Sequence, residues 1–248
     1  MSEKNNKLIY LATIGILSYV VADIIHEVVG HGGACLVIGN KIELLTSVYF
    51  KSSPGNILVD IGGPIANLIF GGLTFYILTR TSFAKLFLFQ VTAYNLFWFS
   101  GTILHSAISK TGDWTFAVKE IVSEPYGKIL LIATGILTYI VILRVLNFYL
   151  RFKNIEQQIE PLTKKNIFYS FLFASIAAFV AGLFFQTDRI NAALEGLLEM
   201  VASLPILFLK FKNKSFDTNY KFRPNYYLAL TVLIFYLFFC LTLGKGIT

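Results

Sequence analysis

Long apolar runs recur along the whole chain, separated by short polar segments. Seven of them are long enough to cross a bilayer as a helix, which takes about 20 residues. They cover residues 8–30, 57–79, 84–109, 128–150, 166–187, 190–209 and 226–244. The pattern predicts an all-α polytopic membrane protein with about seven transmembrane helices. The number falls to six if 190–209 is re-entrant, since Glu195 and Glu199 make that run the most polar of the seven.

One segment between the first two runs has a different pattern. Residues 41–56, KIELLTSVYFKSSPGN, are too short and too polar to span a membrane. Ile42 and Leu44 alternate with polar residues, β-branched and aromatic residues follow, and Ser-Pro-Gly closes the segment. This pattern predicts a strand or a hairpin with a turn.

Composition supports the membrane assignment. Hydrophobic residues make up 56% of the 248 residues, and mean hydropathy is +0.67. The net charge of +7 indicates cytoplasmic loops rich in Lys and Arg rather than a nucleic-acid partner. Cys35 and Cys240 are too few for a cysteine-based metal site. The apolar run after Lys7 lacks a small-residue cleavage site, so we interpret it as a retained helix.

The distribution of basic residues predicts the orientation. Fourteen of the 21 Lys and Arg residues fall on the N-terminal side of the membrane when the seven runs alternate in direction, and seven fall on the other side. Basic residues collect in cytoplasmic loops. We therefore expect a multi-pass protein of the bacterial plasma (inner) membrane, with its N-terminus in the cytoplasm.

Residues 26–31, HEVVGH, carry the candidate chemistry. Ionisable residues within a membrane span are expensive and usually functional, although they can also be sealed in a helix interface. The histidines are five residues apart, so on a regular α-helix they would point about 140° apart. A π-bulge would bring both onto one face, and the nearby Gly30 eases that change. The alternative is a regular helix in which Glu27 and His31, four apart, form the ligand pair.

These residue types fit a hydrolytic zinc site. Such a site needs neutral imidazole ligands, an open position for water and a carboxylate to take the proton of that water. His26 and His31 supply two ligands and Glu27 the base. Asp23, three residues before His26, is expected to orient that histidine as an outer-shell carboxylate.

The third ligand has more than one candidate. His105 lies in the third run at a depth that matches His26 and His31 to within about a turn. Asp113, in TGDW, follows that run and either folds back onto the site or caps the next helix. Glu195 and Glu199 share one face of the sixth run and are further candidates.

At this point the sequence resembles the site-2 protease family of intramembrane zinc metalloproteases, over roughly residues 15–120. The resemblance rests on HEVVGH, on GGPIAN at 62–67 and on NLFWF from Asn95. It implies that His26 and His31 bind zinc and that Glu27 is the base. The strand-like segment would pair with an unwound substrate. The residues that would line the substrate path are Gly62, Gly63, Pro64, Asn67 and Asn95.

The chain departs from the family pattern in two respects. Family members have HExxH, whereas the five-residue spacing here is similar to that of dipeptidyl peptidase III, a soluble zinc peptidase. The family's Asn-x-x-Pro-x-x-x-x-Asp-Gly pattern is also absent after Asn95. The identity of the third ligand, Asp113 or His105, therefore stays open.

We expect a zinc metallopeptidase that cuts a membrane protein or peptide substrate near the extracytoplasmic face of the lipid bilayer. Residues 1–125 would form the metal-site membrane core and 126–248 the accessory helices of the same membrane domain. Two other classes fit the same residues. One is a zinc hydrolase acting on a lipid amide or ester, and the other is a proton- or metal-coupled transporter using these acids and histidines.

Overall fold

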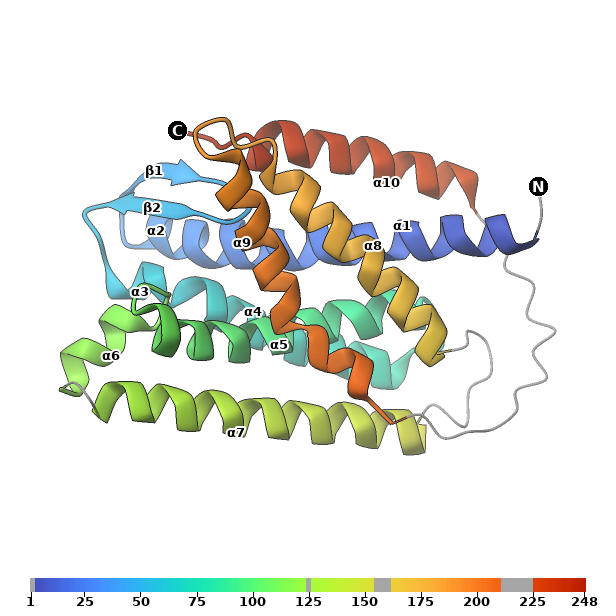
Figure 1. Cartoon of the computed structure of the whole chain (residues 1–248), viewed down its shortest axis with the longest axis horizontal. Coiled ribbons are helices and arrows are strands. Elements are labelled where there is room, and N and C mark those ends of the chain that lie inside the picture. The colour runs from blue at the N-terminus through green and yellow to red at the C-terminus, as the bar shows by residue number, and fades with distance from the viewer. Residues whose placement is uncertain (1–2, 124–125, 154–161, 211–224) are drawn as a thin grey trace.

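The computed structural model describes the chain except residues 1–2, 124–125, 154–161 and 211–224 (Figure 1). The basic residues Lys212, Lys214, Lys221 and Arg223, on which part of the predicted orientation depends, lie outside the described residues. The long helices are α1 (Glu3–Asp23), α4 (Gly62–Arg80), α5 (Lys85–Ser109), α7 (Tyr126–Phe148), α8 (Lys164–Gly182), α9 (Arg189–Ala202) and α10 (Tyr226–Phe239). Shorter helical elements are η1 (Ile24–Gly32), α2 (Gly33–Val37), α3 (Ile57–Asp60), α6 (Thr115–Ile121), η2 (Tyr149–Lys153), η3 (Leu204–Phe208) and η4 (Cys240–Gly244).

Six helical segments among the described residues are long and apolar enough to cross a membrane, which is consistent with an integral membrane protein. They are Lys4–Val37, Ile57–Arg80, Tyr126–Arg151, Lys164–Gly182, Arg189–Phe208 and Tyr226–Gly244. Each overlaps a predicted run, including the sixth, where η3 continues α9 after a turn at Ser203. The first runs on to Val37 instead of ending near residue 30, because the helix passes through the glycines of HEVVGHGG without a break.

The predicted third span, α5, is not among these six, so the count of seven is not confirmed. The helix has 25 residues and is long enough. Its buried face, however, carries polar side chains such as Gln90, Asn95 and Ser100, which lower its mean hydropathy. α5 packs against α1, α4 and α7 and so lies inside the bundle.

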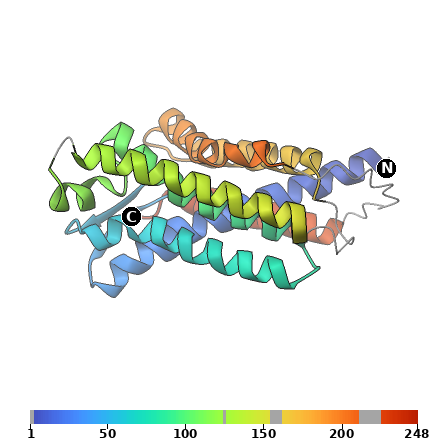
Figure 2. The same cartoon turned by 90° about the horizontal axis from the view of Figure 1, so that it is seen from below.

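The helices α1, α5, α7 and α10 run roughly along the long axis of the molecule, while α8 and α9 cross it obliquely (Figures 1 and 2). Small residues allow these crossings. A Cβ atom on Gly15 of α1 would lie 2.1 Å from the Ser170 carbonyl oxygen of α8. Likewise, a Cβ atom on Gly182 would lie 2.4 Å from the Ala192 carbonyl oxygen of α9. Such close helix contacts are typical of membrane bundles.

The outer surfaces of the helices are apolar. On α7 and α10 large aliphatic side chains point outward, including Leu137, Val141, Leu233 and Leu237, each about half exposed or more. Exposed apolar area of this extent favours contact with lipid. The bundle interior, in contrast, holds the polar side chains of α1 and α5.

The segment 41–56 forms the predicted hairpin. β1 (Lys41–Leu45) pairs antiparallel with β2 (Phe50–Ser53), with an irregularity between Ile42 and Leu44. The turn lies at 46–49 rather than at Ser-Pro-Gly. The Thr46 hydroxyl accepts hydrogen bonds from the backbone N–H groups of Val48 and Tyr49, and this closes the turn. Ser-Pro-Gly instead leads from β2 to α3.

The hairpin lies with α2, α3 and α6 at the end of the bundle opposite the N-terminus (Figure 1). This end therefore contains the strands, the HEVVGH segment and the turn after α5. The division of the chain at residue 125 stays a prediction: α8 packs on α1 and α7 on α5, so the two parts share one bundle.

Candidate metal centre

The helix leaves α geometry at HEVVGH. Residues Ile24–Gly32 form a π-helix, in which residues five apart stack on one face. Nε2 of His26 and Nε2 of His31 consequently lie 3.1 Å apart. Of the two geometries that the five-residue spacing left open, the chain adopts the π form and not the regular helix with Glu27 and His31 as the ligand pair.

His31 is fixed from two sides. Its Nδ1 lies 2.7 Å from the carbonyl oxygen of Val59 in α3. A carbonyl only accepts, so Nδ1 carries the proton and Nε2 presents a lone pair. The ring also stacks on Phe50 of β2, with centroids 5.4 Å apart. The sequence pattern gave no signal for the Val59 contact, which is a backbone interaction.

His26 is oriented by a chain of buried amides. Its Nδ1 donates to Oδ1 of Asn67 at 2.5 Å, Nδ2 of Asn67 donates to Oδ1 of Asn95 at 2.7 Å, and Nδ2 of Asn95 donates to the carbonyl oxygen of Val91 at 2.7 Å. That last carbonyl can only accept, so it sets the direction of the whole chain. Nε2 of His26 therefore presents a lone pair, as Nε2 of His31 does.

Asn67, and not Asp23 as predicted, contacts Nδ1 of His26 and orients its ring. Asp23 is fully buried, but its Oδ2 accepts a hydrogen bond from the Tyr19 hydroxyl at 3.1 Å. Asp23 lies three residues before His26, where the π-helix begins. The changed rotation of the helix turns Nδ1 of His26 toward α4 instead.

Asp113 folds back onto the histidines from the turn after α5. The backbone N–H of Trp114 donates to the Ser106 hydroxyl at 3.0 Å, and the Trp114 indole N–H donates to the Thr102 hydroxyl at 3.1 Å. Gly112 allows this packing, because a Cβ atom there would lie 2.4 Å from Oγ of Ser106. Asp113 does not cap α6, whose first turn receives no side-chain hydrogen bond at its N-terminus.

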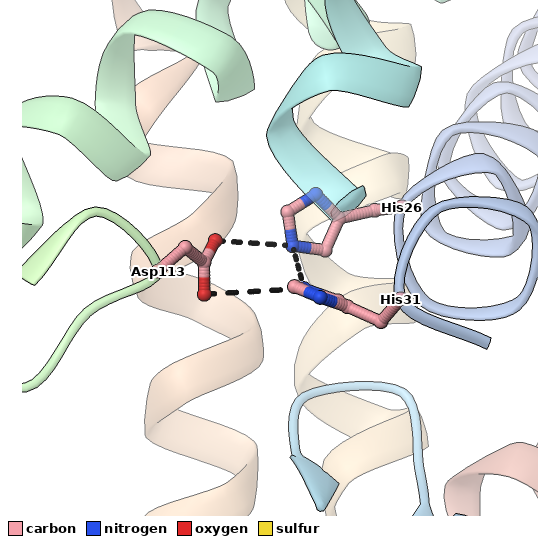
Figure 3. A group of neighbouring side chains, drawn as sticks. All are labelled: His26, His31 and Asp113. Carbon is pink, nitrogen blue, oxygen red and sulfur yellow. Dashed lines mark hydrogen bonds and ion pairs between the residues drawn. The ribbon is translucent and has the colours of Figure 1, made fainter. Parts of the chain in front are cut away.

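The three side chains converge (Figure 3). Oδ2 of Asp113 lies 3.5 Å from Nε2 of His26, and Oδ1 lies 3.9 Å from Nε2 of His31. Burial raises the pKa of Asp113, but its polar contact with His26 and its electrostatic interaction with the neighbouring imidazoles outweigh burial and lower the pKa below its usual value. The carboxylate is thus ionised and faces the two rings, with 26% of its side chain exposed.

The group fits a cation. Three ligand atoms, one each from His26, His31 and Asp113, lie within 4.8 Å of one another. Two lone pairs facing each other repel unless a proton or a metal ion lies between them. Tetrahedral zinc, with ligands at about 2.0–2.1 Å, separates its ligand atoms by about 3.3 Å. The separations of 3.1, 3.5 and 3.9 Å are close to that value, and these three residues are the ones that could hold zinc.

Glu27 lies beside the group. Oε1 is 4.0 Å from Nε2 of His26, and Oε2 is buried without a hydrogen-bond partner among the described residues. Asp23, at the end of α1, and Glu199 of α9 interact electrostatically with Glu27 and with each other. The interior thus contains a row of carboxyl groups that starts at the candidate metal group.

Two glycine-rich segments meet here. A Cβ atom on Gly30 would lie 2.5 Å from Cα of Gly63, and one on Gly62 would lie 2.7 Å from the carbonyl oxygen of Gly30. We expected Gly62 and Gly63 to line the substrate path. In the structure both pack against the backbone of η1 at Gly30. Pro64 is buried in the first turn of α4. Asn67 and Asn95 are buried in the hydrogen-bond chain that orients His26.

The remaining candidates do not join the group. His105 lies in α5, half-buried, and contributes no atom to it. The turn at 110–114 returns the chain beyond His105 and presents Asp113 in its place. Glu195 and Glu199 also contribute no ligand atom.

Comparisons with protein-family models, with curated proteins and with solved structures found no match. The geometry of the group therefore carries the functional argument.

Proposed function

We propose that the chain is an intramembrane zinc metalloprotease that hydrolyses peptide bonds of a membrane-associated protein or peptide near the extracytoplasmic face. One observation carries the proposal. The lone pairs of His26 and His31 and the carboxylate of Asp113 converge beside Glu27, a buried carboxyl with an oxygen that no described residue satisfies. Catalytic zinc sites have three protein ligands and an open position for water, and in zinc proteases a neighbouring glutamate serves as the base.

Zinc held by His26, His31 and Asp113 would supply Lewis-acid polarisation of the scissile carbonyl and a lowered pKa for the attacking water. Glu27 acts as the general base and takes the proton of that water on its free oxygen. It then returns the proton to the leaving amine. The Asn67–Asn95 chain and the Val59 carbonyl keep both imidazoles in the tautomer that exposes Nε2.

The hairpin favours a peptide substrate over a lipid. Leu45 directs its backbone N–H and C=O to Ile247, with both hydrogen bonds 2.9 Å long. In an antiparallel pair the opposite residue then points its own groups the other way. Phe50 pairs with Leu45, so its N–H and C=O face the free edge of β2, next to the ring that stacks on His31. An extended substrate segment can add to this edge.

The proposal includes the membrane placement. α5 would be the seventh span, because its length matches a bilayer and its polar face lies inside the bundle. The N-terminal end of the bundle would be cytoplasmic, since described basic residues such as Lys7, Lys85 and Lys165 cluster there. The metal group would then lie near the extracytoplasmic leaflet.

Metal analysis of the purified full chain tests the site. We expect about one zinc per chain for the wild type and for Glu27→Gln, and little for His26→Ala or His31→Ala. The Glu27→Gln variant keeps its zinc because the residue acts as a base and not as a ligand. A Glu27→Gln chain that loses its zinc would identify Glu27 as a ligand.

Hydrolysis is tested in liposomes that hold the protein and a set of single-span peptides, with cleavage mapped by mass spectrometry. Glu27→Gln should slow cleavage by about 10²–10⁴-fold. N-methylation of single backbone positions in a cleaved peptide should block cleavage where that position pairs with the edge at Phe50. A chain that releases fatty acid from N-acyl or ester lipids in the same liposomes but leaves every peptide intact is a lipid hydrolase instead.

A further inference from the structure

A second candidate site lies at the other end of the bundle, far from the metal group. A groove of about 720 Å³ runs between the C-terminal ends of α4 and α7. Its walls are mainly apolar, and two arginines border it. The residues that line it include Phe75, Arg80, Arg144, Val145, Phe148 and Tyr149.

The two arginines have no anionic partner among the described residues. Arg80 and Arg144 are both exposed, and neither lies within ion-pair distance of a described carboxylate. The guanidinium of Arg80 instead lies over the ring of Tyr76, 5.4 Å from its centroid. Each guanidinium presents a planar fork of N–H donors that suits a phosphate, and two of them border this groove.

Tyr149 provides an independent observation. Its side chain lines the groove, is 2% exposed, and packs on Phe75 and Phe89. Its hydroxyl has no hydrogen-bond partner among the described residues. A buried hydroxyl without a partner costs free energy, so it indicates an acceptor that occupies the groove.

The position of the groove identifies the kind of acceptor. Arg80 ends α4, and Arg144 lies in the last two turns of α7, where helices meet the lipid headgroups. The outward face of α7 is apolar along its length. A molecule that fills the groove therefore needs a negative group at the level of the arginines, an acceptor below it, and an apolar chain.

We propose that this groove binds one anionic phospholipid. Arg80 and Arg144 hold its phosphate, the Tyr149 hydroxyl donates to a glycerol ester carbonyl, which lies deeper than the phosphate, and an acyl chain packs on Phe75, Val145 and Phe148. Basic pockets between transmembrane helices commonly take lipid headgroups in this way. The inference does not depend on the proposed hydrolytic activity.

Native mass spectrometry of the full chain in detergent, titrated with phosphatidylglycerol or with phosphatidylcholine, tests the proposal. We expect tighter binding of phosphatidylglycerol. Arg80→Gln and Arg144→Gln should each weaken it by roughly fivefold, and the double variant by about thirtyfold, at about 1 kcal/mol per basic residue. Phosphatidylcholine should be much less affected by either change.

The Tyr149→Phe variant separates the hydroxyl from the charges. Both lipids have ester carbonyls, so Tyr149→Phe should weaken both by the same factor, roughly 2–10-fold. The matched control is Arg189→Gln with Lys245→Gln, which removes two exposed charges at the opposite end of the bundle and should leave binding unchanged.

Three results would overturn the proposal. They are equal binding of the two lipids, an unchanged preference for phosphatidylglycerol in the double arginine variant, and displacement of the lipid by equimolar glycerol phosphate. The last result would identify a simple anion site. Thermal unfolding of each variant, expected to match the wild type, shows that a loss of binding is not a loss of fold.

Discussion

Gly63 lies directly against the imidazole of His31: a Cβ atom at this position would come within 2.4 Å of Nε2. The same atom would lie 2.8 Å from Nε2 of His26. The first turn of α4 therefore forms one wall of the candidate metal group, and only a residue without a side chain fits there.

Gly63→Ala should consequently displace both ligand nitrogens. We expect zinc affinity to fall by at least the about 10–100-fold that is typical of changes next to a metal site. Competition with a zinc chelator measures it. Gly72→Ala is the control, because a Cβ atom on Gly72, in the same helix, meets nothing within 4 Å. Equal zinc affinities for the two variants would contradict the wall assigned to Gly63.

Asn95→Leu should weaken zinc binding although Asn95 contacts no ligand atom. Without the bond to Asn95, Asn67 is free to flip and the tautomer of His26 is no longer set. We expect a loss of about 10–100-fold in zinc affinity. Gln90→Leu, another buried amide of α5, breaks a hydrogen bond to Ser170 and should lower thermal stability without changing zinc affinity. If both variants bind zinc equally well, the amide chain has no effect on the metal.

Asp113→Asn should remove a ligand charge, whereas His105→Gln should not. We expect Asp113→Asn to lower zinc affinity by more than the about 100-fold upper range of outer-shell changes. His105→Gln should stay within a few-fold of the wild type, since His105 contributes no atom to the group. The reverse order of effects would make His105 the third ligand.

Single cysteines test the orientation in intact cells. Gly55→Cys, in the exposed segment between β2 and α3, should react with a membrane-impermeant thiol reagent from outside, and Ser82→Cys, between α4 and α5, should not. A Cβ atom on Gly55 meets nothing within 4 Å, so the substitution is tolerated. Cys35 and Cys240 are first changed to serine. Labelling of Ser82→Cys alone would mean that the metal group faces the cytoplasm.

The sequence predicted the parts of the structure that depend on local patterns. Apolar run length located the six helices that can span a membrane, and alternation located the hairpin. The five-residue interval between His26 and His31, set against 3.6 residues per turn, left two helix geometries open, and the π form was one of them. All three members of the metal group were candidates before the structure.

Contacts between residues far apart in the sequence could not be predicted from local patterns. His31 and Val59 are 28 residues apart, and His26 and Asn67 are 41 apart. The hydrophobic periodicity of a sequence does not indicate which carbonyl or amide a histidine ring nitrogen will contact. The choice of Asp113 over His105 depends on Gly112 packing against Ser106, which follows from the fold of the turn. The close packing of Gly62 and Gly63 of α4 against Gly30 of η1 also follows from the fold and not from a local sequence pattern.

The π-helix at His26 and His31 also bears on how such a site arises. One added residue widens the hydrogen-bond ladder by one step and leaves the two imidazoles on a shared face. Whether two side chains can bind one metal ion depends on their positions around the helix axis and not on the number of residues between them. A helix that widens over one turn can therefore bring histidines five residues apart as close together as a regular helix brings histidines four residues apart.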